Sequence, residues 1–242
     1  MQNIIFQDLG LIDYKRAWDY QEQLHQEIIT EKLHNRNLAP NLHLPASGYL
    51  LFCEHPPVIT LGKSGKEQNL LMNETWLKQK GIDFYHINRG GDITFHGPQQ
   101  LVGYPLLDLD NFFTDIDKYL RQLEEVVIRA IAEYGIKGDR MEKATGVWLD
   151  VQNPAQARKI CAMGIRTSHW VTMHGFALNV NTDLNYFSYI IPCGLAGKQV
   201  TSLEKELGTK IPLDDVKEKL KRHFEHLFGA KLITKSAEVA LK

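Results

Sequence analysis

Strand-like segments outnumber helix-like ones in this 242-residue chain, and the two kinds do not alternate regularly. Regular alternation is typical of doubly wound nucleotide-binding folds, whereas an irregular order is typical of an α+β domain. No internal repeat and no low-complexity tract divides the chain. We therefore predict a single domain over residues 1–242, with an α+β fold in which helices flank a mixed β-sheet.

Three stretches have the apolar periodicity of amphipathic helices. They are residues 13–33, residues 115–134, and residues 212–228, the last with Gly229 as its stop. Residues 35–47 are rich in Asn, Pro and His and are predicted to form a surface loop.

Eight shorter segments have patterns typical of strands. Residues 49–53 are a continuous apolar run, which is typical of a strand covered on both faces. Pro105 lies inside another segment and predicts an edge strand or a break, because proline cannot donate to a ladder. The eight segments are residues 4–7, 49–53, 58–61, 83–88, 101–109, 146–151, 158–166 and 170–180.

The composition excludes several classes of protein. The three cysteines are odd in number and form no Cys-x-x-Cys pair, which argues against a disulfide framework and a zinc site. Residues 1–10 lack the pattern of a secretory signal, and no apolar run is long enough to cross a membrane. A formal net charge of -1 gives no argument for nucleic-acid or membrane binding. We expect a cytoplasmic protein with reduced thiols.

Residues 89–98, Arg-Gly-Gly-Asp-Ile-Thr-Phe-His-Gly-Pro, form the first candidate site. Paired Gly90 and Gly91 allow a ligand to approach the backbone closely. Thr94 and His96 then lie two apart on one side of a predicted strand. Such a segment suits an oxygen-rich ligand, but it is equally consistent with a hairpin turn that has incidental polar residues. It is not a dinucleotide fingerprint, because the glycine spacing and the following helix are absent.

Residues 158–166 form the second candidate. Strict alternation places Lys159 and Cys161 on one face, where the lysine charge would stabilise a nearby thiolate. The alternative is a lysine at a solvated strand end.

The third candidate is Cys193, which lies between Pro192 and Gly194. A tight turn there would expose the sulfur and point a backbone N–H at an oxyanion. Cys53, inside an apolar run, is predicted to be a core residue. The residue pattern favours Cys193 over Cys161 as a nucleophile but leaves both open.

The chain resembles the lipoyl(octanoyl) transferase family from about residue 49 to about residue 203. In this family the usual His-Gly-Pro-Gly-Gln has a glycine where this chain has Gln99, a change that removes no reacting group. The resemblance rests on five segments in the family's order: residues 54–62, residues 89–98 with 100–105, residues 159–166, residues 174–180 and residues 191–194.

The resemblance implies the fold of the biotin/lipoate ligase catalytic domain, no cofactor, and a role in protein lipoylation. Octanoyl would pass from octanoyl-acyl carrier protein, through a thioester on Cys193, to a lysine of lipoyl domains in 2-oxoacid dehydrogenase complexes and glycine cleavage H protein. Lys159 would stabilise the thiolate, and His96 would position groups or transfer protons. The substrate-contact residues it implies are Arg89, Gly90, Gly91, Asp92, Ile93, Thr94, Phe95, His96, Ala162, Met163, Gly164, Gly175, Phe176 and Ala177.

Small side chains at Gly175 and Ala177, beside Ala162 and Gly164, suggest a narrow apolar slot for a straight acyl chain. This hypothesis predicts that Gly175→Leu blocks long donors and leaves the protein folded. Competing functions are an ATP-dependent lipoate or biotin ligase, an amidotransferase between lipoylated proteins, and a non-catalytic acyl- or carrier-binding module. A cysteine hydrolase would more often use a histidine base.

Overall fold

The computed structural model describes residues 1–39, 42–43, 48–191 and 199–236. Its main sheet has the strand order β12-β1-β2-β6-β10-β9-β8-β7, and β11 pairs with β9. These strands are β1 (Gln2–Leu11), β2 (Tyr49–Glu54), β6 (Gln100–Leu106), β7 (Asp139–Met141), β8 (Ala144–Leu149), β9 (Arg158–Ser168), β10 (Val171–Asn179), β11 (Gln199–Val200) and β12 (Ala230–Thr234).

A smaller sheet has the order β4-β3-β5. Its strands are β3 (Val58–Leu61), β4 (Asp83–His86) and β5 (Ile93–His96), and the α-helices are α1 (Tyr14–Asn35), α2 (Glu74–Gln79), α3 (Ile116–Ala132), α4 (Leu203–Leu207) and α5 (Leu213–Phe228). In the main sheet β1 pairs in parallel with β12 and β2, whereas β2, β6, β10, β9 and β8 pair antiparallel in turn. The predicted α+β fold with a mixed sheet is confirmed.

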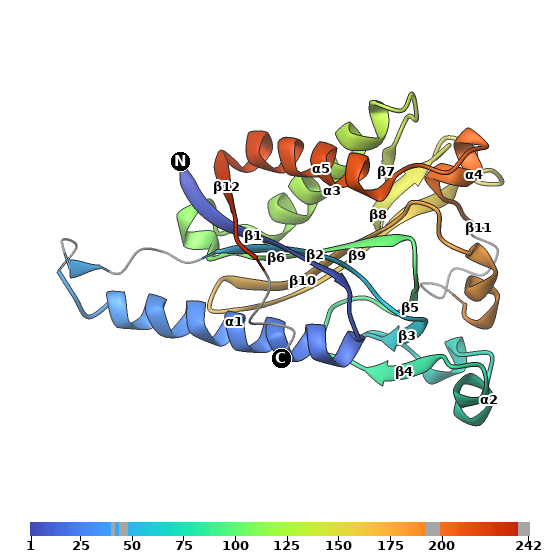
Figure 1. The fold of residues 1–242 in the computed structure, drawn as a ribbon, viewed down its shortest axis with the longest axis horizontal. Helices are drawn as coiled ribbons and strands as arrows, with labels where there is room; N and C mark the ends of the chain where they lie inside the picture. The colour runs from blue at the N-terminus through green and yellow to red at the C-terminus, as the bar shows by residue number, and fades with distance from the viewer. Residues whose placement is uncertain (40–41, 44–47, 192–198, 237–242) are drawn as a thin grey trace.

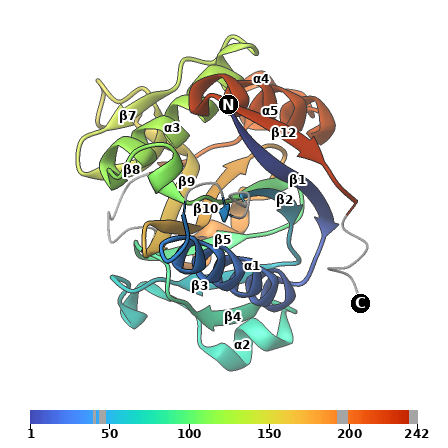
Figure 2. The ribbon, with the colours of Figure 1, turned by 90° about the vertical axis from the view of Figure 1, so that its left-hand side faces the viewer.

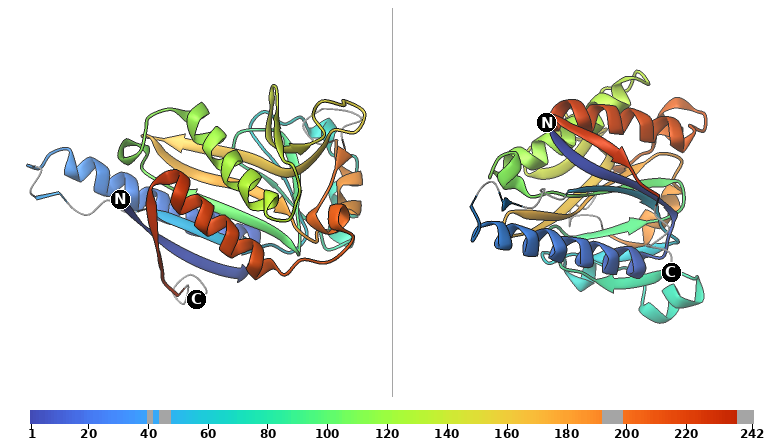
Figure 3. Two further views of the ribbon diagram at one scale, coloured as in Figure 1. Left: turned by 90° about the horizontal axis from the view of Figure 1, so that it is seen from above. Right: turned by 60° about the vertical axis from the view of Figure 1, so that its left-hand side comes forward.

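Helices cover both faces of the main sheet. Figure 1 shows α3 and α5 on one face and α1 on the other, and Figures 2 and 3 show the same layers from other sides. Strand β2 explains the arrangement, because Leu50 and Phe52 join the core beneath α3 and α5, whereas Leu51 and Cys53 join the core beneath α1. The continuous apolar run at residues 49–53 is therefore a strand buried on both faces, as predicted.

The predicted helices are confirmed, and capping explains where they begin and end. The Asp13 carboxylate accepts from the N–H of Arg16 at the start of α1, and the Asp115 carboxylate accepts from the N–H of Lys118 at the start of α3. Gly229 ends α5 with a left-handed φ of 59°. None of the helices in the described ranges is both long and apolar enough to cross a membrane.

Of the two alternatives predicted from Pro105, an edge strand is wrong, because β6 is a central strand between β2 and β10 and every one of its residues is buried. A break is found, but only in the ladder between β6 and β10. The ladder between β6 and β10 runs only from Gln100 to Gly103. Pro105 lies beyond it, so the missing proline N–H leaves no hydrogen bond to β10 unmade. Thr172 bridges this gap: its hydroxyl donates to the Pro105 carbonyl at 2.9 Å and accepts from the Leu107 N–H at 3.0 Å. A side chain thus replaces the ladder beside the proline.

Candidate active site

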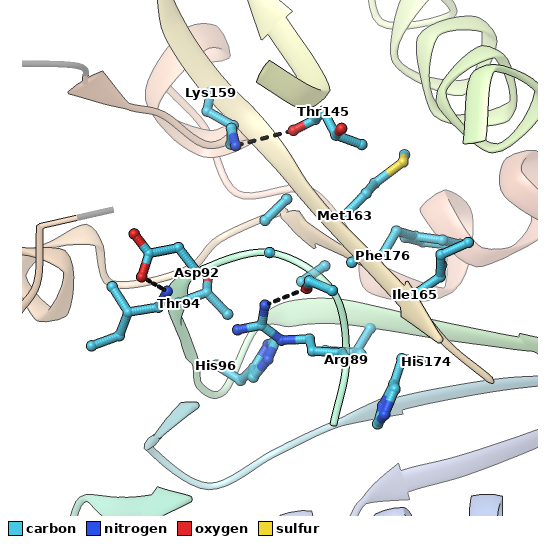
Figure 4. A pocket seen from close by; sticks show the side chains of 18 of the residues that line it. Arg89, Asp92, Thr94, His96, Thr145, Lys159, Met163, Ile165, His174 and Phe176 are labelled. Carbon is cyan, nitrogen blue, oxygen red and sulfur yellow. Dashed lines mark hydrogen bonds between the residues drawn. The ribbon is translucent and has the colours of Figure 1, made fainter. Parts of the chain in front are cut away.

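A cavity of about 450 Å³ lies where β8 stops pairing with β9. Every substrate-contact residue predicted above except Phe95 lines it, and Lys159 does too. Figure 4 shows Lys159 and Thr145 toward one end of the lining and the rings of His96 and His174 toward the other. The further lining residues that the sequence did not single out include Tyr14, Gln100, Leu120, Thr145, Asn179 and Val200.

The loop of residues 89–91 is fixed against β9. The Gly90 N–H donates to the Ile165 carbonyl at 2.8 Å, and a Cβ on Gly164 would lie 2.6 Å from the Gly90 oxygen. Arg89 is buried, and its guanidinium donates to both the carbonyl and the hydroxyl of Thr60, each at 3.0 Å. The segment is therefore a fixed part of a cavity wall, and the alternative of a hairpin turn with incidental polar residues is wrong.

Lys159 is held inside the protein. Only 8% of the residue is exposed, its ammonium donates to the Thr145 carbonyl at 3.1 Å, and Nζ lies 4.7 Å from the centre of the Trp148 ring. Cation–π contact and a carbonyl partner compensate in part for the removal of this charge from water. The alternative of a lysine at a solvated strand end is wrong.

Cys161 does not lie on the same face of β9 as Lys159. A register shift in the ladder places Val147 opposite Cys161 and Trp148 opposite Lys159, so β9 has one more residue than β8 between these two pairs. Ile160 and Cys161 both enter the core beneath α3. Burial raises the pKa of the Cys161 thiol, so it stays protonated, and its exposure is 0%. The expected common face of Lys159 and Cys161 is therefore not found, and Cys161 is unsuited to be a nucleophile.

Cys193 lies outside the described residues, and the residues on either side of its segment connect to the cavity wall through Asp92 and Val200. The N–H of Ile191 donates to the Asn69 carbonyl at 2.8 Å, and the Asn69 amide donates to the Asp92 carboxylate at 2.7 Å. On the other side, Val200 lines the cavity and pairs in parallel with Lys159.

His96 is neutral, and its tautomer can be assigned. The Gln100 amide donates to the Phe95 carbonyl and to Asn179, so its oxygen must accept, and it does so from His96 Nδ1 at 2.8 Å. Nδ1 therefore carries the proton, and Nε2 is an acceptor. Burial, with the nearby His55 and Arg89, lowers the pKa of His96 to about 3.

His174 is a second buried histidine in the cavity wall. Asn88 donates to Glu22 through its amide nitrogen, so its oxygen accepts from His174 Nε2 at 2.8 Å. Nδ1 is then an acceptor, and it is buried with no partner among the described residues. Burial lowers the pKa of His174 to about 3. The sequence placed His174 in a family segment but did not identify it as a cavity residue.

Comparison with known proteins agrees with this geometry. Residues 13–225 match the family described as lipoyl protein ligase A/B catalytic domain. The chain is 61% identical to the octanoyltransferase of Flavobacterium johnsoniae over 233 residues, which cover 96% of this chain and 99% of that one. It is 54% identical to the octanoyltransferase of Cytophaga hutchinsonii over 227 residues, which cover 94% and 93% of the two chains. The chain belongs to the octanoyltransferase family.

Solved structures support the fold assigned to this octanoyltransferase family member. A structure of a bi-partite lipoate protein ligase with its E2 lipoyl domain from Thermoplasma acidophilum gives a TM-score of 0.72 at 16% identity, covering 98% of this chain and 88% of that one. A lipoate-protein ligase A bound with ATP gives a TM-score of 0.70 at 16% identity, covering 98% and 89%. At this identity the likeness concerns the fold alone.

The family's glycine position, occupied here by Gln99, keeps a glycine-like backbone. Gln99 has a φ of 64°, a left-handed conformation that costs a non-glycine residue about 1–2 kcal/mol. Its side-chain oxygen accepts from the Asn181 amide at 2.8 Å, and its own N–H donates to the Glu54 carboxylate at 2.6 Å. These bonds stabilise the left-handed conformation of Gln99 in this octanoyltransferase family member.

Two expectations for the family's contact residues need correction. Phe95 does not line the cavity, because its ring stacks on Tyr186 in the core of the small sheet, with centroids 4.5 Å apart. A Cβ on Gly175 would lie 2.1 Å from the Gly103 carbonyl oxygen and 2.7 Å from Pro105. Gly175 is therefore required by the close approach of β6, so a side chain at position 175 must displace that strand and Gly175→Leu cannot test the acyl slot alone.

Proposed function

We propose that this member of the octanoyltransferase family transfers octanoyl groups to lipoyl domains through a thioester on Cys193, assisted by Lys159. The observation that carries the proposal is the buried ammonium of Lys159 at one end of the cavity, beside the strand that follows the Cys193 segment. A positive charge removed from solvent favours a nearby thiolate more strongly than one in water.

The chemistry requires two acyl transfers. The Cys193 thiolate attacks the carbonyl carbon of the donor thioester, and the carrier sulfur leaves as a thiolate that takes a proton from solvent. The neutral amine of the acceptor lysine then attacks the new thioester, the carbon–sulfur bond to Cys193 breaks, and the proton that the amine loses passes to the departing sulfur. Because the donor is already an activated ester, neither transfer requires ATP.

Chain connectivity supports the pairing of Cys193 with this cavity. Cys193 is two residues beyond Ile191, and two residues of chain span at most about 7 Å. The partner of Ile191, Asn69, is itself bonded to the cavity residue Asp92. The buried state of Cys161 removes the competing nucleophile.

His96 acts by positioning in this proposal. A histidine whose pKa is lowered to about 3 is neutral near pH 7, and its Nε2 is too weak a base to accept a proton from an amine. Its Nε2 lone pair instead accepts a hydrogen bond from a donor in the cavity, and Gln100 fixes the ring for that purpose.

The proposed partners come from the resemblance to the octanoyltransferase family. The donor is octanoyl-acyl carrier protein, and the acceptors are lipoyl domains of 2-oxoacid dehydrogenase complexes and glycine cleavage H protein, all met in the cytoplasm. The reaction is the first step of protein lipoylation. We propose the whole of residues 1–242 as a single catalytic domain.

Intact mass measured after incubation with octanoyl-carrier protein, without ATP, tests the proposal. Wild type and Cys161→Ser should gain one octanoyl group, which a lipoyl domain then removes. Cys193→Ser should gain none, and Lys159→Ala should acylate slowly. Acylation that requires ATP and free octanoate would instead identify a ligase, and an adduct retained by Cys193→Ser would refute the assigned nucleophile.

A further inference from the structure

Glu124 of α3 is a fully buried carboxylate that contacts β8. Its side chain has 0% exposure. Oxygen Oε2 accepts from Arg121 at 2.6 Å and from Arg140 at 3.1 Å. Oxygen Oε1 accepts instead from the backbone N–H of Gly146, at 2.9 Å. Oε1 of Glu124 thus binds the backbone N–H of one peptide group in β8.

That peptide group is the one that holds Lys159. The carbonyl of Thr145 and the N–H of Gly146 belong to the same peptide bond, so its N–H faces Glu124 while its oxygen accepts from the Lys159 ammonium at 3.1 Å (Figure 4). A carboxylate, a peptide and an ammonium therefore lie in series. An N–H that donates to an anion raises the negative charge on the carbonyl oxygen of its own peptide, which strengthens the bond to the cation.

The backbone at Gly146 is built for this contact. Gly146 has a φ of 118°, and a Cβ there would lie 2.4 Å from the Cys161 carbonyl oxygen. A side chain at position 146 would therefore push β8 away from β9 and turn the peptide. Glycine and the buried carboxylate together fix the direction of the Thr145 carbonyl.

We infer that Glu124 is a positioning residue for the acyl transfer, acting on Lys159 through the peptide bond between Thr145 and Gly146. The inference rests on the proposed pairing of Lys159 with Cys193. It separates Glu124 from its neighbour Glu125, which accepts from Arg129 and Arg140 through hydrogen bonds that involve neither Thr145 nor Gly146. Glu125→Gln is therefore a matched control, since it perturbs the same arginine cluster.

The test is the pH dependence of Cys193 alkylation by iodoacetamide in the folded full-length protein, followed by peptide mass. Lys159→Ala should raise the midpoint by about 1–3 pH units. Glu124→Gln should raise it by about 0.3–1 unit, because a less polarised peptide holds the ammonium less firmly. Glu125→Gln should leave it unchanged. If Glu124 acted on the thiolate directly by charge repulsion, Glu124→Gln would remove that repulsion and lower the midpoint instead.

A lowered or unchanged midpoint in Glu124→Gln, with a raised one in Lys159→Ala, overturns the inference and leaves the proposed function standing. An unchanged midpoint in Lys159→Ala overturns the proposed pairing and the inference with it. If Glu124→Gln does not fold, the NMR resonance of the Gly146 amide proton tests the inference. It should lie further upfield in Lys159→Ala than in the wild type. A resonance that stays in place refutes the series arrangement.

Discussion

Gly164 of β9 lies directly opposite Gly175 of β10 in the antiparallel ladder, and both line the cavity. Each of the two glycines is in close contact with a different backbone segment. A Cβ on Gly164 would strike the Gly90 oxygen, and a Cβ on Gly175 would strike the Gly103 oxygen. The pair therefore allows backbone to approach β9 and β10 closely, and the cavity wall at this point is made of main chain.

Gly175→Ala should lower the free energy of unfolding by about 1–3 kcal/mol, because β6 must move to admit a methyl group. Urea unfolding followed by circular dichroism measures this change. Gly48→Ala is the control, since a Cβ there meets nothing closer than 3.6 Å. Equal stability of the two variants would contradict the close approach described for β6.

Gly164→Ala should displace the loop of residues 89–91 and reduce kcat/KM for the octanoyl donor by about tenfold or more, because small displacements of positioning groups are costly. Steady-state transfer to a lipoyl domain measures the effect. Gly48→Ala should retain wild-type kcat/KM, since it does not line the cavity. Wild-type kinetics in Gly164→Ala would show that the loop does not position the substrate.

Met163→Ala should widen the cavity and shift preference from octanoyl toward decanoyl thioesters by about tenfold or more, the value of one to two methylene groups in an apolar site. Competition between the two donors, read by the mass of the acylated lipoyl domain, measures the ratio. Met173→Ala is the control: Met173 is buried but does not line the cavity, so its loss should reduce stability alone. An unchanged ratio in Met163→Ala would place the acyl chain elsewhere.

Stability should fall as the pH is lowered from about 6.5 to 5. The buried environments of His55, His96 and His174 lower their pKa values to about 4, 3 and 3, so the unfolded chain binds protons in this range while the folded protein does not. Each histidine contributes a slope of up to about 1.4 kcal/mol per pH unit. Urea unfolding at several pH values measures the total.

His174→Asn removes one of these groups and should flatten the dependence, since asparagine tolerates the left-handed φ of 62° at this position. An unchanged slope in this variant would show that His174 does not titrate between the folded and unfolded states.

Local signals in the sequence were sufficient for elements with caps or continuous apolar runs, such as α3 with Asp115 and the doubly buried β2. Pro105 correctly indicated a break in one ladder but not the central position of β6, because the Thr172 hydroxyl that replaces the ladder lies 67 residues away. Strand β12 was missed because its outer residues are exposed and its pairing with β1 is not local.

In the candidate site, too, residues with a local sequence signal were predicted, and residues that depend on distant contacts were not. Glycines, Arg89 and Lys159 were recognised because their segments are continuous and resemble a family. Strict alternation failed at Cys161, because a bulge is invisible in a strand's own residues. Glu124 was read as part of a helix, since nothing in α3 reveals which peptide its carboxylate meets.

The parallel pairing of β1 with β12 has a consequence for synthesis. Gln2 is opposite Ala230 and Phe6 is opposite Thr234, so β1 finds its outer neighbour only 228 residues further along the chain. Until residues 230–234 leave the ribosome, β1 has an unpaired edge able to add strands from other chains. Contacts of such long sequence separation also slow folding. A nascent chain stalled before Ala230 should thus depend on chaperones far more than the finished protein does.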